Sequence, residues 1–217
     1  MKYVLLLILL TLAGCAEGHP REPSVYERAD EVSFRLEQDS GVICSGWAIG
    51  HHAIVTDEHC IEGGVKGWRI DGRRVRVSQV LKDGNDHVIL ITDLYFRQVA
   101  KLGPVPQRGD EVFTLGNPDG QSDILLRGHV AGFKGTYVVE GWGKFYDITL
   151  IDSNDWKGCS GAAVFDSQGR VIGVVNAIWP FPNRGWKLAA AFGLRFTPDQ
   201  YTIATNAGPQ ENWVVSE

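Results

Sequence analysis

The segment Asp152-Ser-Asn-Asp-Trp-Lys-Gly-Cys-Ser-Gly-Ala-Ala-Val-Phe-Asp166 decides the fold. It places Ser160 in a glycine-containing turn that leads into a run of small and apolar residues, the pattern of a turn before a strand. Gly158 and Gly161 leave the approach to the serine hydroxyl open. A tight turn there also aims the backbone N–H groups of Gly158 and Ser160 at one point, where they could hold an oxyanion. Alone, the tetrapeptide Gly158–Gly161 favours an ordinary turn before a strand, and it becomes informative only with partner residues elsewhere in the chain.

A histidine and an aspartate precede this serine. His59 follows a β-branched stretch in Ala53-Ile-Val-Thr-Asp-Glu-His-Cys60, and Asp86 opens the apolar stretch Asn85-Asp-His-Val-Ile-Leu-Ile91. A serine hydroxyl is a poor nucleophile near neutral pH. It needs a base, and the base needs a carboxylate that fixes its tautomer. The order His, Asp, Ser therefore predicts Ser160 as nucleophile, His59 as general base and then acid, and Asp86 as the orienting carboxylate.

Six short motifs occur in one order between Ser45 and Phe196, and together they resemble the trypsin-like serine proteases, most closely the bacterial HtrA/Deg-type protease domain. The motifs are Ser45-Gly-Trp-Ala-Ile-Gly50, Val55-Thr-Asp-Glu-His-Cys60, Asn85-Asp86, Thr114-Leu-Gly-Asn-Pro-Asp-Gly120, Gly128-His-Val-Ala-Gly132 and Gly169-Arg-Val-Ile-Gly-Val174. The resemblance implies an all-β fold of two six-stranded antiparallel barrels with a short C-terminal helix. It also implies a serine endopeptidase that works through an acyl-enzyme, with a protein or peptide as substrate and without cofactor or metal.

The resemblance further implies a disulfide between Cys44 and Cys60, next to the predicted base. Two reduced core thiols are the alternative, and an oxidising compartment disfavours it. The chain departs from the family at Cys159, where an aspartate or asparagine is usual, and at Ala162-Ala163, where Gly-Pro is usual. Without a carboxylate before the serine, pairing with a newly cleaved N-terminus is impossible, so no zymogen cleavage is expected. Reaction of Cys159 itself is an alternative, disfavoured because this position normally points away from substrate.

The substrate pocket is the least constrained part of the site. Counting back from the nucleophile, the resemblance puts the base of the pocket at Asn154, with Asp155 beside it. The strand residues Asn176, Ala177 and Ile178 match the pocket wall. Ile178 would narrow the pocket and favour small or medium uncharged side chains, whereas Asp155 could instead recruit a basic one.

The first 27 residues are predicted to lie outside the fold. Lys2 is typical of the short basic region that begins a signal peptide, and the apolar stretch from Val4 to Leu12 has the length of the hydrophobic region that follows it. This stretch is too short for a membrane span of roughly 20 residues. Leu12-Ala-Gly-Cys15 resembles a bacterial lipobox. We therefore expect residues 1–14 to be a cleaved signal, and Cys15 to be lipidated at the head of a polar tether over 15–27, on an exported protein anchored to a bacterial cell membrane. A plain secretory signal with an incidental cysteine is the alternative.

The rest of the 217 residues suits one protease domain over 28–206 and a tail over 207–217, with no PDZ domain expected. Apolar and polar residues alternate in short runs, which is typical of strands. Asp166-Ser-Gln-Gly169 predicts a hairpin turn, and Thr197-Pro-Asp-Gln200 predicts a capped helix start. The net charge of −5 gives no reason to expect a nucleic-acid partner.

Two other functions stay open on sequence alone. The first is a catalytically silent lipoprotein that keeps the fold as an interaction module, which intact His59, Asp86 and Ser160 disfavour. The second is a protease restricted to one partner, for which the unusual Cys159 leaves room. A metal site at His51, His52, His59 and Cys60 is disfavoured because the spacing matches no standard zinc pattern.

Overall fold

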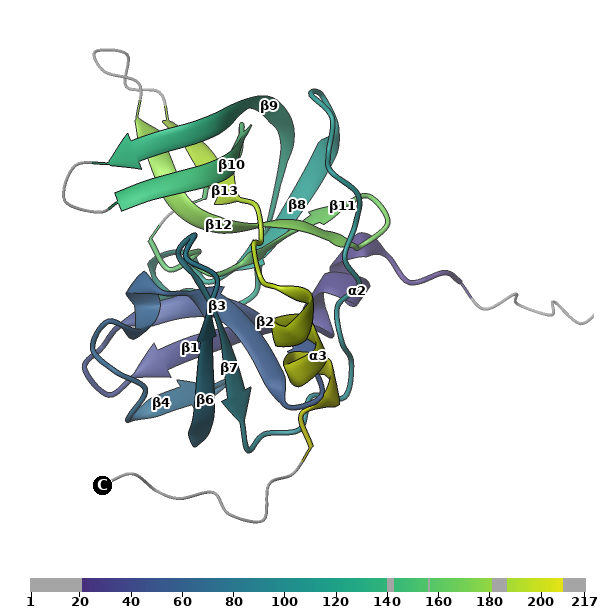
Figure 1. Ribbon diagram of the computed structural model, residues 1–217. Coiled ribbons are helices and arrows are strands. Elements are labelled where there is room, and N and C mark those ends of the chain that lie inside the picture. Colours follow the sequence, from purple (N-terminus) through teal and green to yellow (C-terminus); the bar gives the residue numbers. More distant parts are fainter. Residues whose placement is uncertain (1–20, 140–142, 156, 181–186, 209–217) are drawn as a thin grey trace, which may run out of the picture.

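The computed structural model describes residues 21–139, 143–155, 157–180 and 187–208. Two curled antiparallel β-layers lie one above the other, the N-terminal layer below and the C-terminal layer above in Figure 1. The first layer is a sheet in the order β5-β4-β1-β2-β3-β7-β6. Its strands are β1 (Ser33–Gln38), β2 (Ile43–Gly50), β3 (Ala53–Asp57), β4 (Trp68–Ile70), β5 (Arg73–Arg74), β6 (Val77–Lys82) and β7 (His87–Thr92). The expected six strands become seven because the two-residue β5 pairs with β4.

The second layer is a closed six-stranded barrel in the order β10-β13-β12-β11-β8-β9, as predicted. Its strands are β8 (Glu111–Gly116), β9 (Ile124–Val139), β10 (Gly143–Ile151), β11 (Ala163–Asp166), β12 (Val171–Pro180) and β13 (Lys187–Phe192). The hairpin predicted at Asp166–Gly169 joins β11 to β12. The Asp166 carboxylate accepts there from the N–H groups of Gln168 and Arg170, and Gly169 has φ +73°.

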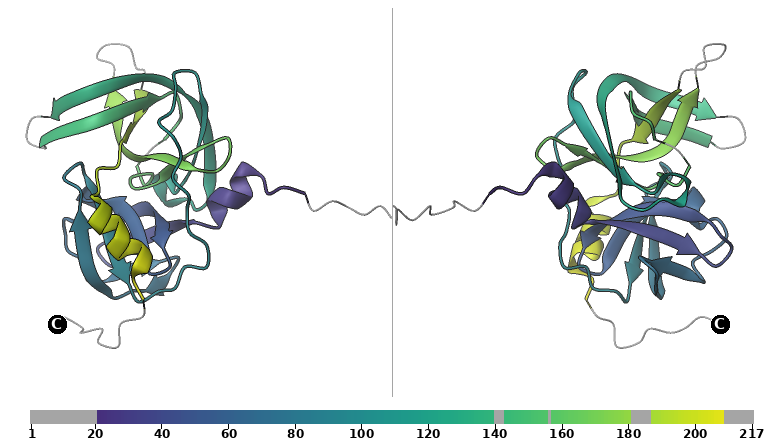
Figure 2. Two further views of the ribbon diagram at one scale, coloured as in Figure 1. Left: turned by 45° about the vertical axis from the view of Figure 1, so that its right-hand side comes forward. Right: turned by 180° about the vertical axis from the view of Figure 1, so that it is seen from behind.

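Two α-helices flank these layers. The helix α3 (Pro198–Asn206) begins at the predicted cap, where the Thr197 hydroxyl accepts from Gln200 N–H and the Gln200 amide oxygen accepts from Thr197 N–H. Figure 2 shows α3 lying across the first sheet, and its Ala204 is fully buried. The helix α2 (Val25–Asp30) was not predicted, although Ser24 and Glu27 form the same kind of capping box. Neither described helix has the length and apolar character that a membrane span requires.

One apolar core crosses the boundary between the layers. Trp47 and Val55 of the first sheet belong to the same buried cluster as Leu115, Phe165 and Val174 of the second. Trp47, Val55, Phe165 and Val174 are completely buried. Burying an apolar side chain of this size stabilises a fold by roughly 1.5–3 kcal/mol. The two layers are therefore held together by a shared core, and residues at their boundary keep a fixed relative position.

The disulfide between Cys44 and Cys60 is present, as the resemblance implied. Cys44 lies in β2, and Cys60 lies in the short 3-10 helix η1 (His59–Ile61), so the bond ties the turn that carries His59 to its neighbouring strand. Both cysteines are buried in a cluster with Leu36 and Ile54.

Removing this bond by the double substitution Cys44→Ala and Cys60→Ala should lower the free energy of unfolding by about 3 kcal/mol, because the unfolded chain regains the freedom of a short closed loop. Urea denaturation of the oxidised protein and of the variant measures the loss. Reductant should destabilise the wild type and leave the variant unchanged. A variant as stable as the oxidised wild type would contradict the prediction.

Candidate active site

The turn that carries Ser160 is held by β2 of the other layer. Ser45 N–H donates to Ser160 O at 2.8 Å, and the Ser45 hydroxyl donates to Gly158 O at 2.8 Å. Gly158 has φ +98° and Gly161 has φ +84°. A Cβ at Gly161 would lie 2.2 Å from Ser45 O, and one at Gly158 would lie 2.1 Å from Asn117 O. Both positions therefore require glycine, for conformation and for space.

The peptide before Gly158 is oriented by a second loop. Asp119 N–H, in the 3-10 turn η2 (Pro118–Gly120), donates to Lys157 O at 2.7 Å. In a trans peptide the N–H points opposite to the C=O. The N–H of Gly158 is therefore turned away from η2. Within the described chain, neither this N–H nor that of Ser160 donates to another group, which is the arrangement that an oxyanion hole needs.

His59 and Asp86 are brought together as predicted from their order in the chain. The Asp86 carboxylate accepts from His59 Nδ1 at 2.8 Å and from His59 backbone N–H at 3.1 Å. Because a carboxylate only accepts, Nδ1 carries the hydrogen and Nε2 is left as the basic nitrogen. Asp86 has φ +69°, a conformation that aspartate tolerates better than most residues, and its C=O accepts from Glu58 N–H at 2.7 Å.

The backbone of Ser160 lies beside the residue after the base, with Ser160 O at 4.0 Å from Cys60 Sγ. Among the described residues, no hydrogen bond joins Ser160 Oγ to His59 Nε2. Such bonds are often long in a free enzyme and tighten when substrate binds. The structure thus brings the turn, the base and the acid to one place at the boundary of the two layers.

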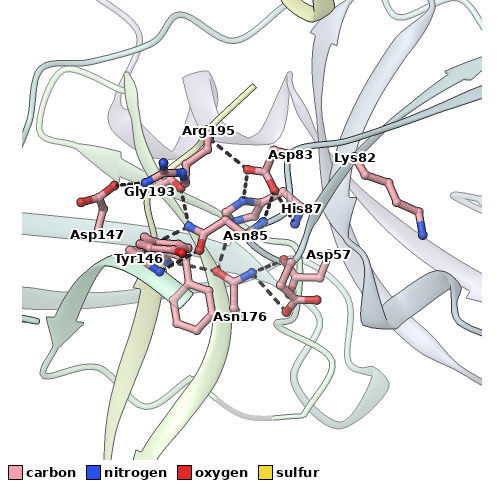
Figure 3. Close-up of polar contacts among 12 residues, drawn as sticks. Asp57, Lys82, Asp83, Asn85, His87, Tyr146, Asp147, Asn176, Gly193 and Arg195 are labelled. Atoms are coloured by element: carbon pink, nitrogen blue, oxygen red, sulfur yellow. Dashed lines mark hydrogen bonds and ion pairs between the residues drawn. The ribbon is translucent and has the colours of Figure 1, made fainter. Parts of the chain in front are cut away.

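Asn85 anchors the acid loop to the second barrel (Figure 3). Its amide nitrogen donates to Tyr146 O at 3.1 Å and to Gly193 O at 2.8 Å, and its amide oxygen accepts from Tyr146 N–H at 2.8 Å. The side chain is completely buried, so each of these bonds replaces one that water can no longer supply. Asp86, the next residue, is therefore fixed relative to both layers.

A buried pair lies directly behind the acid. Asp83 accepts from His87 Nδ1 at 2.7 Å, and both side chains are fully buried. Burial works to raise the pKa of Asp83, but hydrogen bonding and charge from His87, with backbone donors at Arg195 and Asn85, hold that pKa below its usual range. The other ring nitrogen of His87 faces the amide oxygen of Asn176 at 3.3 Å. Neither Asp83 nor His87 was predicted as part of the site.

The predicted pocket residues lie in different environments. Asn154 and Ala177 are exposed, and Ile178 is half-buried. The side chain of Asn176 is buried and turned toward the acid side of the site. Its amide nitrogen donates to Asp57 at 2.8 Å and lies 3.5 Å from Asp86 Oδ2.

Asp155 and Cys159 are both buried in the second barrel. Cys159 is completely inaccessible in a cluster with Val112 and Val164, which weighs against its reaction with substrate. Burial raises the pKa of Asp155 to about 6, against the opposing effect of a hydrogen bond with Cys159. The Ser153 hydroxyl also donates to Asp155. A carboxyl group that is buried in this way is poorly placed to form an ion pair with a basic side chain of the substrate.

One group of possible metal ligands occurs at the site. Asp57, His59 and Cys60 place one candidate atom each within 4.8 Å of one another. The sulfur of Cys60 is committed to the disulfide with Cys44 and has no thiolate to offer. This group therefore lacks the three protein ligands that a metal centre needs.

Comparison with known proteins agrees with this architecture. Residues 44–174 match the family described as the trypsin-like peptidase domain, and the chain belongs to this family. It is a serine endopeptidase of the trypsin-like type. No curated protein sequence matches the chain significantly.

Several solved structures share the fold. The active form of the Rv3671c protease from M. tuberculosis superimposes with a TM-score of 0.66 at 16% identity, over 92% of this chain and 98% of that one. The HtrA-type protease AlgW with a decapeptide gives 0.64 at 18% identity, over 78% of this chain and 63% of that one. Deg5 gives 0.59 at 19% identity, over 78% and 86%. At these identities the likeness concerns the fold alone.

The raised pKa of Asp155 predicts a pH-dependent stability. The native state keeps a proton that the unfolded chain releases near pH 4, so stability should fall as pH rises from about 4 to about 6. Asp155→Asn mimics the protonated acid and should remove this loss. Above about pH 7 the variant should be more stable than wild type by roughly 2–3 kcal/mol, and below about pH 4 the two should coincide.

Urea denaturation across this pH range measures the difference. Glu62→Gln, which alters an exposed carboxyl, is the matched control and should follow the wild-type curve. A constant offset between Asp155→Asn and wild type at every pH would show that Asp155 does not gain a proton on folding.

Proposed function

We propose that Ser160, His59 and Asp86 form the catalytic triad of this endopeptidase. The observation that carries the proposal is the double contact of Asp86 with His59, beside a turn whose Gly158 and Ser160 N–H groups donate to no other group of the described residues. Asp86 fixes the tautomer in which Nε2 can accept a proton. Ser160 then attacks the peptide carbonyl as His59 takes its proton, and the resulting imidazolium gives that proton to the leaving amine.

The oxyanion of the tetrahedral intermediate binds the N–H groups of Gly158 and Ser160 in this proposal. Both belong to a turn whose shape is set by bonds from Ser45 and Asp119, so they need little reorganisation when charge develops. Preorganised donors of this kind are worth about 10²–10³ in rate each. In the second step His59 takes a proton from a water molecule, which attacks the carbonyl of the acyl-enzyme. The bond to Ser160 Oγ then breaks, and the serine recovers its proton from His59.

The substrate is a peptide or protein, as the family implies. For the residue before the scissile bond we propose a small or medium uncharged side chain. Asn154, Ala177 and Ile178 offer no charge to it, and the carboxyl of Asp155 is buried beside Cys159. The structure of AlgW contains a bound decapeptide, and this observation on that protein supports the same substrate class here.

The protein is proposed to act as an exported lipoprotein. Cys15 and the lipobox before it lie outside the described residues, and the proposal rests on the sequence of 1–15. Expression of the full chain in a bacterial host should give a mature protein that begins at Cys15, carries acyl chains and partitions into detergent. Cys15→Ser should abolish acylation, as measured by intact mass and phase partition. A Cys15→Ser protein that still carries acyl chains would contradict the lipobox assignment.

Labelling with a fluorophosphonate tests the catalytic proposal. The protein beginning after Cys15 should be labelled, and the modified peptide should contain Ser160. Ser160→Ala should reduce labelling to background, because it removes the reacting oxygen. Cys159→Ala is the matched control and should still be labelled, since the Cys159 thiol is buried in the barrel.

Absence of labelling in folded protein with an intact Cys44–Cys60 bond would overturn the proposal of a constitutively active site. It would favour the silent or partner-restricted lipoprotein instead. Labelling at Cys159 would overturn the assignment of Ser160.

A further inference from the structure

Asp57 places a second carboxyl group beside the proposed catalytic base. It is the last residue of β3, pairs in register with His87 of β7, and is completely buried. The motif that identified His59 contains Asp57, yet the triad does not use it. A buried carboxyl without a role in the proposed mechanism calls for a physical account.

His59 lies between two carboxyl groups. Its Nδ1 is 2.8 Å from Asp86 Oδ2, and its Nε2 is 3.9 Å from Asp57 Oδ2. The other oxygen of Asp57 accepts from the Asn176 amide at 2.8 Å (Figure 3). The same amide nitrogen lies 3.5 Å from Asp86 Oδ2. Within the described chain, Asp57 Oδ2 has no hydrogen-bond partner. The unpartnered oxygen is thus the one that is nearer to Nε2.

The two carboxyl groups differ in the support that they receive. Asp86 accepts two hydrogen bonds from His59 and keeps a small exposed fraction, whereas Asp57 is completely buried and is supported, among the described residues, only by the neutral Asn176 amide and the nearby Gly161 N–H. Two neighbouring carboxylates in such a site cannot both ionise cheaply, and the less supported one keeps a proton. The charge therefore falls on Asp86 and the proton on Asp57.

The other ionisable groups around Asp57 do not reverse this assignment. They are His59 on η1, Asp86 and Asp83 in the loop before β7, and His87 opposite on β7; the neighbouring Glu58 pairs with Lys82 at the surface. His87 is already paired with Asp83. Burial, followed by the charges of Asp86 and Asp83, raises the pKa of Asp57 well above its usual range, against the opposing effect of the nearby Gly161 N–H.

We propose that Asp57 is a positioning residue of the catalytic centre, which keeps a proton beside Nε2 of His59 while Asp86 carries the charge at Nδ1. The catalytic meaning of this inference rests on the proposed function. If Asp57 loses its proton, the new charge stabilises the imidazolium form of His59, because opposite charges at this separation favour each other. His59 is then less available as a base for Ser160. By keeping its proton, Asp57 leaves His59 available as a base near neutral pH.

Asp57→Asn is the sharpest test, since an asparagine reproduces the protonated acid in size and cannot ionise. The rate of fluorophosphonate labelling is measured against pH for wild type, Asp57→Asn and the surface control Asp93→Asn. The acidic limb of Asp57→Asn should coincide with that of wild type and the neutral plateau should stay within a few-fold, because the variant carries the same neutral group beside His59 as the protonated acid. The control should superimpose on wild type.

Two outcomes would overturn the proposal. One is an acidic limb that moves to lower pH by about one unit in folded Asp57→Asn, which would mean that Asp57 carries a negative charge beside His59 in the wild type. The other is loss of labelling at every pH with the fold intact, which would mean that the ionised form is required.

A second measurement does not depend on turnover. Imidazole ¹⁵N resonances of His59 are followed against pH in Ser160→Ala and in Ser160→Ala with Asp57→Asn, and their midpoint should be the same in both. A midpoint that shifts downward in the double variant overturns the inference even where labelling fails. If Asp57→Asn does not fold, the carboxyl ¹³C resonance of Asp57 in Ser160→Ala, assigned through its Cβ, should report a protonated acid at pH 7, and a carboxylate there would refute it.

Discussion

The position of the Asp86 and His59 pair relative to the second barrel depends on the closure of two β-layers against each other. His59 follows β3 and Asp86 precedes β7, and these two strands are paired along the whole length of β3. Asp86 has a left-handed conformation, φ +69°, within the loop before β7. Asn85 ties the same loop to Tyr146 and Gly193 of the second barrel, and the shared apolar core prevents the layers from sliding. The contact of Asp86 with His59 is thus formed within the first layer, and Asn85 fixes its position relative to the second barrel.

The polar groups behind the site form one connected network. Asn176 donates to Asp57 and accepts from Phe192 N–H, and its amide oxygen faces His87, which in turn pairs with Asp83. The backbone donor at Phe192 fixes which end of the Asn176 amide is oxygen, so the direction of the other bonds follows. Buried networks of this kind are rigid when satisfied and costly when one member is lost. The unpartnered oxygen of Asp57 is the exception, and it lies on the side of the reacting histidine.

The sequence allowed the closed second barrel, the C-terminal helix and the disulfide to be predicted, because each has a local motif; the triad assignment rests on similar local motifs and stays a prediction. It did not reveal Asn85 or His87 as supports, because their partners lie far along the chain and alternation of residue type does not say which groups meet. Asn176 was expected at the pocket wall, while its side chain is turned to Asp57 and Asp86. Asp57 did carry a signal. A charged residue at the end of a wholly buried strand conflicts with its surroundings, and such conflicts tend to mark functional sites.

The replacement of a carboxylate by Cys159 before the nucleophile follows from how the turn is held. In this chain Ser45 binds the turn from β2, and Asp119 binds the preceding carbonyl from η2, so the Gly158 N–H is directed without an ion pair. The side chain at position 159 is then free to enter the apolar barrel, where a Cβ at Gly116 would already lie 3.1 Å from the sulfur. An unpaired carboxylate in that space would carry the large cost of a buried charge. The small Cys159 side chain fills this space without such a charge.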